Sequence, residues 1–288
     1  MTNAMGSAER SRLNTSFLEE YNSEDSIRKY TRNTAGHGIG HLLDHEYGKI
    51  YLECIERYVP KSRLKTGIRL WEFGCGAGMN LLHLVSVLER RGIPVDYACG
   101  TDFSETLIAA AKTEASNYIT TNQANRVRFT VARNEDLIEQ GAKGLGLGKG
   151  ELLGSFDLVL GVNTIRYGHR LNNVDRCIEG IRGLLRDNGV CIVIDMNRKF
   201  PVFRSRLREW PSKDAEDTFL PTLDEYARPF SSAGFEILRK ENFCWIPHSA
   251  GRGLTAVMKT LTPVLNTLIA SRAMRSLVIS RKVPPICR

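Results

Sequence analysis

Residues 70–79 read LWEFGCGAGM, and this stretch decides the fold because an apolar strand leads into a glycine-rich turn that opens a helix. Gly74, Gly76 and Gly78 permit positive φ angles and a close approach of the backbone to a ligand. Glu72 stands just before the turn, where its carboxylate could accept from a ribose hydroxyl or bind a cationic group. The junction therefore predicts a site for a nucleotide-like cofactor.

The glycine spacing separates two classes of cofactor. A dinucleotide fingerprint has the form G-x-G-x-x-G, but Met79 stands where its third glycine would be. The observed pattern, Glu72-x-Gly74-x-Gly76-x-Gly78, instead resembles the motif E/D-x-G-x-G-x-G of the class I S-adenosylmethionine-dependent methyltransferases. The resemblance implies S-adenosylmethionine as cofactor and S-adenosylhomocysteine as its product. A plain strand-to-helix turn is the alternative.

Apolar runs bounded by turn residues alternate with helical segments, which predicts repeated βα units. We expect an α/β fold with a Rossmann-like, seven-stranded, mostly parallel sheet and helices on both faces. A helical cover precedes the sheet, and a helix is inserted before the last strand. Strands are expected at 68–73, 95–101, 127–131, 156–162, 190–196, 235–245 and 277–280, and helices at 80–91, 104–120, 172–185 and 222–233.

The expected domain organisation follows the same pattern. Residues 1–16 are polar and predict a loose tail, and 17–65 predict the N-terminal helical cover. Residues 66–288 form the expected methyltransferase domain, which contains the inserted helical segment 248–272. Residues 141–154, rich in Gly, Leu and Lys, predict a mobile loop.

Composition limits the cellular context. The net charge is +8 and the pI about 9.2, but the charge is spread along the chain, which favours a generally basic surface over a nucleic-acid site. No apolar run approaches the roughly 18 residues of a membrane span. Seven cysteines show no paired spacing, which favours a reducing compartment. We therefore expect a cytoplasmic protein.

A second cofactor mark lies at the end of the second expected strand. Gly100-x-Asp102-x-Ser104 resembles the second motif of the same methyltransferase family. Ligands of a doubly wound sheet bind at the carboxyl ends of its strands, so Asp102 is expected to hold the ribose hydroxyls. The alternative is that Asp102 caps the following helix, although Ser104 competes for that role.

The adenine contact departs from the family pattern. Relatives often carry an aspartate after the third strand, and Arg133 stands there instead. Asn134 or Glu135 is therefore expected to reach the adenine, with main-chain groups as the alternative. Phe103 is expected to lie near the face of the ring, and a plain core position is the alternative. The expected cofactor site also includes the main chain at Cys75 and, for the methionine end of the donor, Asn163 after the fourth strand.

The acceptor side lacks one informative motif. No Asn/Asp-Pro-Pro-Tyr/Phe follows the fourth strand, which counts against methylation of a nucleobase. Arg166 and Tyr167 follow that strand, and Tyr21 and Tyr30 lie in the expected cover; these four are expected to contact the acceptor. Each also fits a plain surface position.

A hydroxyl acceptor benefits from a general base, and histidine has a suitable pKa. His37 is the first expectation, His169 the second, and Asp195, at the end of the fifth strand, an alternative base or anchor. His37, His41 and His45 would share one face of a helix, but no cysteine or carboxylate completes a recognisable metal-ligand spacing, so no metal is expected.

These observations predict methyl transfer to a small-molecule acceptor, such as a natural-product or biosynthetic intermediate, with oxygen favoured over nitrogen or carbon. Two further classes stay open, an RNA-modifying or nucleic-acid-binding protein and an NAD-type oxidoreductase. Association with a membrane surface is not favoured. The apolar residues at helical spacing within 248–272 leave a homodimer open.

Overall fold

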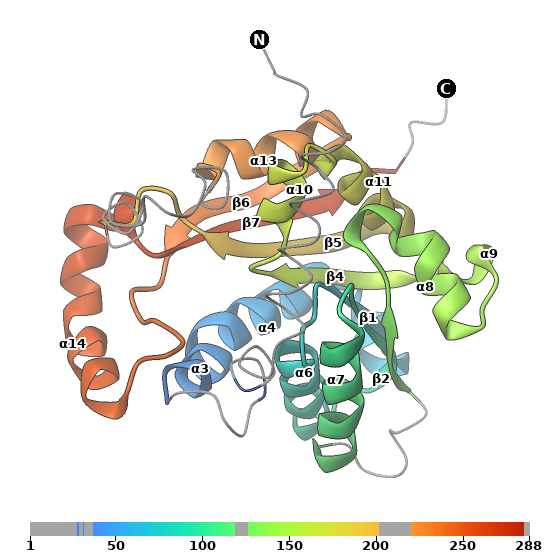
Figure 1. Ribbon diagram of the computed structural model, residues 1–288, viewed down its shortest axis with the longest axis horizontal. Coiled ribbons are helices and arrows are strands. Elements are labelled where there is room, and N and C mark those ends of the chain that lie inside the picture. Colours follow the sequence, from blue (N-terminus) through green and yellow to red (C-terminus); the bar gives the residue numbers. More distant parts are fainter. Residues whose placement is uncertain (1–27, 29–30, 32–36, 119–125, 202–219, 285–288) are drawn as a thin grey trace.

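The computed structural model describes residues 28, 31, 37–118, 126–201 and 220–284. Its centre is one sheet of seven strands in the order β3-β2-β1-β4-β5-β7-β6 (Figure 1). Neighbouring strands are parallel from β3 to β5, whereas β7 is antiparallel to both β5 and β6. The strands are β1 (Ile68–Phe73), β2 (Val95–Asp102), β3 (Val127–Val131), β4 (Phe156–Val162), β5 (Leu185–Met196), β6 (Phe235–Phe243) and β7 (Arg275–Lys282).

This architecture confirms the expected α/β class, the seven strands and their mostly parallel arrangement. The four expected helices are all present, and each of their ends lies one or two residues from the expected position. The helices of the described chain are α3 (His37–His41), α4 (Tyr47–Tyr58), α5 (Lys61–Thr66), α6 (Met79–Arg90), α7 (Glu105–Tyr118), α8 (Leu137–Leu145), α9 (Lys149–Leu152), α10 (Ile165–Arg170), α11 (Val174–Leu184), α13 (Leu223–Ser232) and α14 (Arg252–Ile269), with π-helix η1 (Leu42–Glu46) and 3₁₀ turns η2 (Asn134–Asp136) and η4 (Ala270–Arg272).

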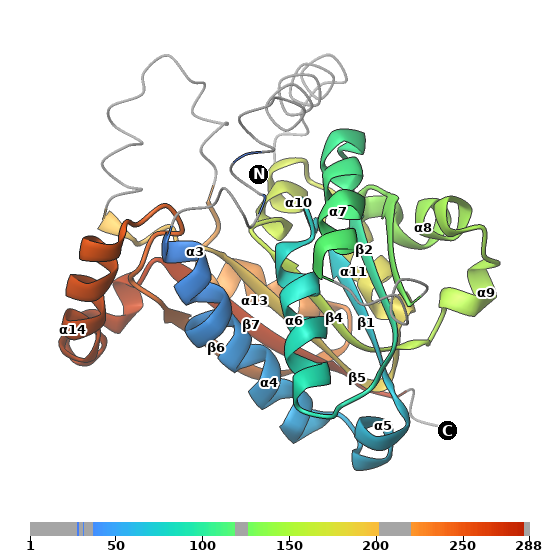
Figure 2. The same cartoon turned by 90° about the horizontal axis from the view of Figure 1, so that it is seen from below.

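Alternation along the strands produces two apolar layers. In β4, Leu158 and Leu160 point to one face of the sheet and Val159 to the other, because successive side chains of a strand point in opposite directions. The first face packs against α4, α6 and α7, and the second against α8, α11 and α13 (Figure 2). A parallel sheet covered on both faces is buried throughout, which explains the continuous apolar runs in the sequence.

The expectation of a loop over 141–154 is wrong. Helix α8 includes Gly141 and Gly144, and α9 follows it. A Cβ atom on Gly141 would lie 2.9 Å from the Trp71 ring, and one on Gly144 would lie 1.9 Å from Thr130 Oγ1. These glycines therefore allow the helix to pack closely against the sheet, and their abundance reflects packing rather than flexibility.

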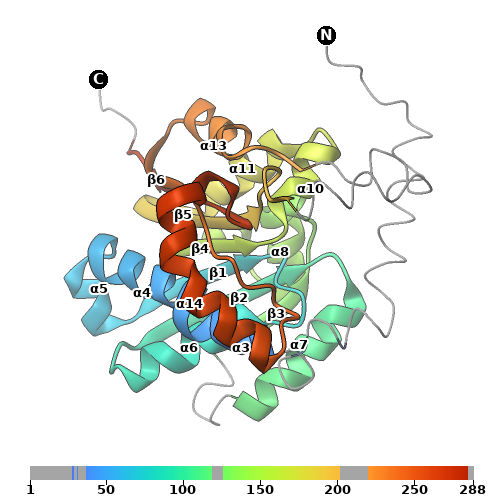
Figure 3. The ribbon, with the colours of Figure 1, turned by 90° about the vertical axis from the view of Figure 1, so that its left-hand side faces the viewer.

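Helix α14 lies before β7, where the inserted helix was expected, at the outside of the molecule (Figure 3). Its inner side faces α3 and buries Thr255, while Met258 is half-buried. The opposite side is apolar and exposed, and consists of Leu254, Val257, Leu261, Val264 and Leu268. Within the described ranges no helix combines the length and the apolar character needed to cross a membrane.

Candidate functional site

The glycine-rich turn after β1 adopts a backbone that only glycine enters readily. Gly74, Gly76 and Gly78 have φ angles of +61°, +54° and +79°. A Cβ on Gly74 would also lie 2.2 Å from Thr164 Oγ1, so the turn packs directly against the segment that follows β4. The turn is anchored to β2, because the Cys75 amide donates to the Thr101 carbonyl at 2.8 Å.

Glu72 lies fully buried beneath this turn. Its Oε2 accepts from the Leu81 amide at 3.0 Å and its Oε1 accepts from Asn80 Nδ2 at 3.2 Å. Burial raises the pKa of the Glu72 carboxyl to about 8, against the opposing effect of these two hydrogen bonds. Both oxygens therefore contact the start of α6.

Asp102 ends β2 and binds the same turn. Its Oδ2 accepts from the Gly76 amide at 2.9 Å, and its Oδ1 accepts from the Ser104 amide at 3.0 Å. Ser104, not Asp102, caps α7, because its Oγ accepts from the Leu107 amide. Burial raises the pKa of Asp102 to about 6. Glu72 and Asp102 thus place two acidic groups at the strand ends where the donor site was predicted.

The remaining residues predicted for the cofactor surround this turn. Cys75 is buried, and burial raises the pKa of its thiol well above the usual range, so the side chain is a neutral filler. Phe103 follows Asp102 and is half-buried. Asn134 and Glu135 lie in η2 after β3, and Asn134 Nδ2 donates to Thr164 Oγ1 at 2.7 Å. That hydrogen bond holds the predicted adenine side against the loop after β4.

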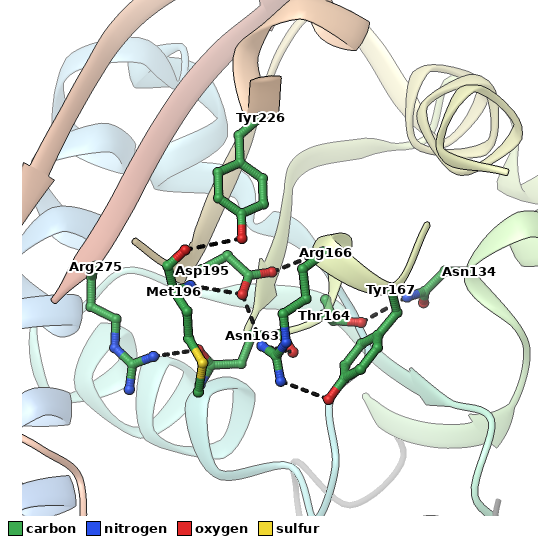
Figure 4. Close-up of polar contacts among 9 residues, drawn as sticks. All are labelled: Asn134, Asn163, Thr164, Arg166, Tyr167, Asp195, Met196, Tyr226 and Arg275. Carbon is green, nitrogen blue, oxygen red and sulfur yellow. Dashed lines mark hydrogen bonds and ion pairs between the residues drawn. The ribbon is translucent and has the colours of Figure 1, made fainter. Parts of the chain in front are cut away.

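Asn163 directly follows β4 in a left-handed conformation, with φ of +57°. Its amide donates to the Ile194 carbonyl at 2.7 Å, and its own carbonyl accepts from Arg166 Nη1 at 2.8 Å. Its side-chain oxygen accepts from Arg275 Nη1 at 2.6 Å. Asn163 thus joins two arginines that lie on either side of it (Figure 4).

Arg166 and Asp195 form a buried ion pair in this network. Asp195 is fully buried, and its Oδ1 accepts from Arg166 Nη1 at 2.8 Å and from the Met196 amide at 2.8 Å. Its Oδ2 accepts from the Arg166 amide at 3.0 Å. Because both oxygens accept hydrogen bonds, Asp195 is placed to position Arg166, and of its two expected roles this geometry favours the anchor over the general base.

Tyr167 lies beside Arg166, as the sequence order requires. Arg166 Nη2 donates to the Tyr167 hydroxyl at 2.6 Å, and the guanidinium carbon lies 4.3 Å from the centroid of the ring. The arginine is therefore fixed by a carboxylate on one side and an aromatic ring on the other. Tyr21 and Tyr30, the other two predicted acceptor contacts, lie outside the described residues.

The predicted histidine bases occupy different surroundings. His37 is exposed at the first residue of α3. His169 packs edge-on against the ring of Tyr226, with the centroids 5.6 Å apart. Burial lowers the pKa of His169, and its Nε2 is buried without a hydrogen-bond partner. Of the two histidines, His169 is therefore the half-buried one near the Asp195 network, and its lowered pKa favours the neutral imidazole.

The other helical histidines also meet as expected from their spacing. The rings of His41 and His45 lie 4.9 Å apart, and burial together with the nearby Lys259 lowers the pKa of His41 to about 4. Within the described residues, no three His, Cys, Asp or Glu side chains gather in a group that could hold a metal ion.

Sequence reasoning missed Arg275, because the last strand was expected to begin at residue 277. The structure begins β7 at Arg275 and pairs this residue with Met196 of β5. An antiparallel last strand begins at the edge where the parallel strands end, so its first residues reach the ligand side of the sheet. An arginine just before the apolar run 277–279 was the available signal.

Comparison with known proteins identifies this arrangement. Residues 71–191 match a family model described as a methyltransferase domain. These residues form a methyltransferase domain. This description supports S-adenosylmethionine, the cofactor expected from the glycine spacing, over a dinucleotide. The match covers the glycine-rich turn, Asp102 and the loop after β4.

Relatives of this domain occur within much larger proteins. The citrinin polyketide synthase of Monascus ruber is 24% identical over 194 residues, which are 66% of this chain and 7% of that protein. The methylphloroacetophenone synthase of Cladonia uncialis is 32% identical over 169 residues, 57% of this chain and 6% of that protein. The chain thus spans less than a tenth of these relatives.

A solved structure supports the fold. Magnesium protoporphyrin IX methyltransferase from Synechocystis PCC 6803, with bound S-adenosylhomocysteine, has a TM-score of 0.58 to this chain at 13% identity. The alignment covers 93% of this chain and 99% of that one. Two proteins with so few identical residues share the seven-stranded methyltransferase architecture.

Proposed function

We propose that this protein transfers the methyl group of S-adenosylmethionine to a small-molecule acceptor of the polyketide kind, a phenol or an enolisable ketone. The observation that carries the proposal is the joint presence of a matched methyltransferase domain and a buried polar network at the adjacent strand ends. The likeness to parts of polyketide synthases supports the acceptor class.

The reaction is an in-line displacement at the methyl carbon. The nucleophile forms its bond to that carbon as the carbon–sulfur bond breaks, and the electron pair of the broken bond remains on sulfur to give S-adenosylhomocysteine. Most of the catalytic effect comes from placing the nucleophile behind the methyl group. Main-chain groups around Gly76, together with Asp102, are proposed to hold the donor for this attack.

We assign the methyl group to oxygen, as the sequence analysis favours. A phenolic or enolic hydroxyl must lose its proton, and His169 is the proposed base because a neutral imidazole can accept one. His37 is exposed, and Asp195 is engaged by Arg166, so neither is preferred. Arg166 and Tyr167 are proposed to form part of the acceptor surface.

The cellular context remains a prediction. The six cysteines among the described residues are all buried and free, which supports a reducing compartment such as the cytoplasm. The exposed apolar side of α14 is the proposed contact surface of a homodimer, and the molecular mass in solution tests this association. Neither affects the proposed reaction.

A direct test combines donor binding and turnover. Calorimetry with S-adenosylhomocysteine is expected to show binding, and incubation with S-adenosylmethionine and phloroacetophenone to give a product heavier by one methyl group in mass spectrometry. Nuclear magnetic resonance of the product then distinguishes an oxygen-bound from a carbon-bound methyl group. Absence of donor binding would overturn the whole proposal, whereas a carbon-bound methyl group would overturn only the choice of oxygen.

The base assignment has its own test. His169→Gln is expected to lower kcat about a hundredfold at pH 7, in the range typical for loss of a general base. The affinity for S-adenosylhomocysteine should not change, because the base acts on the acceptor. His45→Gln, at an exposed histidine, is the control. A kcat within twofold of the wild type would exclude His169 as the base.

A further inference from the structure

Arg275 is a buried cation that has no carboxylate partner in the part of the chain that the structure describes. The residue is 1% exposed, yet its guanidinium donates to the side-chain oxygen of Asn163 and lies beside the hydroxyl of Tyr47, both of which are neutral groups. Its Nε is buried without a partner. Among the described residues, no aspartate or glutamate forms an ion pair with its guanidinium.

Three other buried or half-buried arginines have a carboxylate partner. Arg166, with 11% of its side chain exposed, is paired with Asp195. Arg63 and Arg186 both lie beside the buried carboxylate of Asp157. Burying a charge with no counter-charge is costly, and a protein interior normally supplies a partner. The exception at Arg275 points to a partner that arrives with a ligand.

The position of Arg275 in the sheet indicates which ligand supplies its negatively charged partner. It begins β7 opposite Met196 and lies next to Asn163, so it occupies the carboxyl edge of the sheet at β4 and β5 (Figure 4). Glu72 and Asp102, the acidic residues predicted to bind the donor, lie at the ends of β1 and β2 instead. Arg275 therefore lies on the acceptor half of the edge, on the opposite side of Asn163 from Arg166.

We propose that Arg275 binds the oxyanion of the acceptor, the phenolate or enolate from which the methyl group is attacked. This inference rests on the proposed function and names the charge state of its substrate. A guanidinium stabilises the ionised form of the bound hydroxyl and orients it through paired N–H donors.

In the chemical step, the proton of the hydroxyl passes to the base, and the electron pair of the oxyanion forms the new bond to the methyl carbon. The donor sulfur then becomes neutral as it accepts the pair of the broken bond.

The methionine carboxylate of the donor is the competing anion, and calorimetry separates the two. S-adenosylhomocysteine carries that carboxylate, whereas 5′-methylthioadenosine lacks it. Arg275→Gln is expected to leave the affinity for both compounds within twofold. Weakening of S-adenosylhomocysteine binding by tenfold or more, with methylthioadenosine unchanged, would assign Arg275 to the donor and overturn the proposal.

The acceptor arm uses phloroacetophenone titrated into protein saturated with S-adenosylhomocysteine. Arg275→Gln is expected to weaken its binding at least tenfold. The control is Arg281→Gln, on the same strand, where the arginine is exposed and paired with Glu236. Equal affinity in the Arg275 variant and the wild type would overturn the proposal.

Melting temperatures test whether Arg275 serves the ligand or the fold, and this test does not require the wild type to bind phloroacetophenone. Arg275→Met removes an unpaired buried charge, so the ligand-free protein is expected to melt about 2–4 °C higher. A fall of that size would show that Arg275 serves the fold and would overturn the proposal. Failure of the proposed function is recognised separately, as absence of S-adenosylhomocysteine binding by the wild type.

Discussion

The two ends of the site differ in charge. At the ends of β1 and β2, Glu72 and Asp102 are buried carboxyl groups with raised pKa values, and their hydrogen bonds come from neutral amides. At the ends of β4, β5 and β7, Arg166 is balanced by Asp195 while Arg275 is not. One end therefore favours a cation and the other an anion. The difference matches a sulfonium donor and an ionised acceptor.

The largest effect is expected when the buried Arg166–Asp195 ion pair at the proposed acceptor end is broken. Arg166→Met leaves Asp195 buried and unpaired, which should reduce the free energy of unfolding by about 3–5 kcal/mol. Denaturant unfolding monitored by circular dichroism measures the loss. The matched control is Arg281→Met, whose exposed pair with Glu236 should contribute no more than about 1 kcal/mol. Equal losses in the two variants would contradict the contrast drawn between buried and exposed pairs.

A second substitution tests the donor end by shape rather than charge. Gly74→Ala adds a Cβ where Thr164 Oγ1 lies 2.2 Å away, so we expect the affinity for S-adenosylhomocysteine to fall about a hundredfold, or roughly 3 kcal/mol. Isothermal titration calorimetry measures it.

Gly146→Ala is the control for this substitution, because Gly146 also has a positive φ, of +68°, but has open space around it. It should lower the stability slightly and leave donor affinity intact. Equal donor affinities in both variants would show that the turn after β1 does not form the donor site.

The smallest expected effect is a pH dependence of binding affinity that differs between S-adenosylmethionine and S-adenosylhomocysteine. Burial raises the pKa of Glu72 from 4.5 to about 8 and that of Asp102 from 3.8 to about 6. The folded, ligand-free protein thus holds protons that the unfolded chain has released, and these groups reduce its stability as pH rises through those ranges.

A sulfonium favours the ionised carboxylates, so S-adenosylmethionine should bind about threefold to tenfold more tightly at pH 8 than at pH 6. S-adenosylhomocysteine, neutral at sulfur, should change less. Calorimetry at both pH values measures the two affinities. Parallel profiles for the two compounds would remove the electrostatic role given to Glu72 and Asp102.

The donor end was predictable because its signals are local. The glycine spacing, Glu72 and the strand that precedes them lie within ten residues, and Asp102 follows directly from the end of the next strand. The acceptor end depends on register between distant segments. Asn163 and Arg275 are 112 positions apart and meet only because β7 runs antiparallel to β5. Nothing near residue 275 in the sequence specifies that pairing.

The wrong prediction at 141–154 has a related cause. Glycine in a helix costs about 1 kcal/mol relative to alanine, so Gly141 and Gly144 favoured a loop when only local preference was considered. Burial of Leu137, Ala142 and Leu145 against the sheet outweighs that cost. Similarly, both oxygens of Asp195 accept hydrogen bonds that only the fold reveals, and of the two roles expected for this residue these contacts favour the anchor over the base.

The tight packing of Gly74 against Thr164 has a kinetic consequence. Thr164 adjoins Asn163, and Asn163 accepts from Arg275, so the turn proposed to hold the donor and the loop proposed to face the acceptor touch each other directly. A donor that settles the first segment also restrains the second. We therefore expect a compulsory order of addition, in which the nucleotide enters before its co-substrate and leaves after the methylated product.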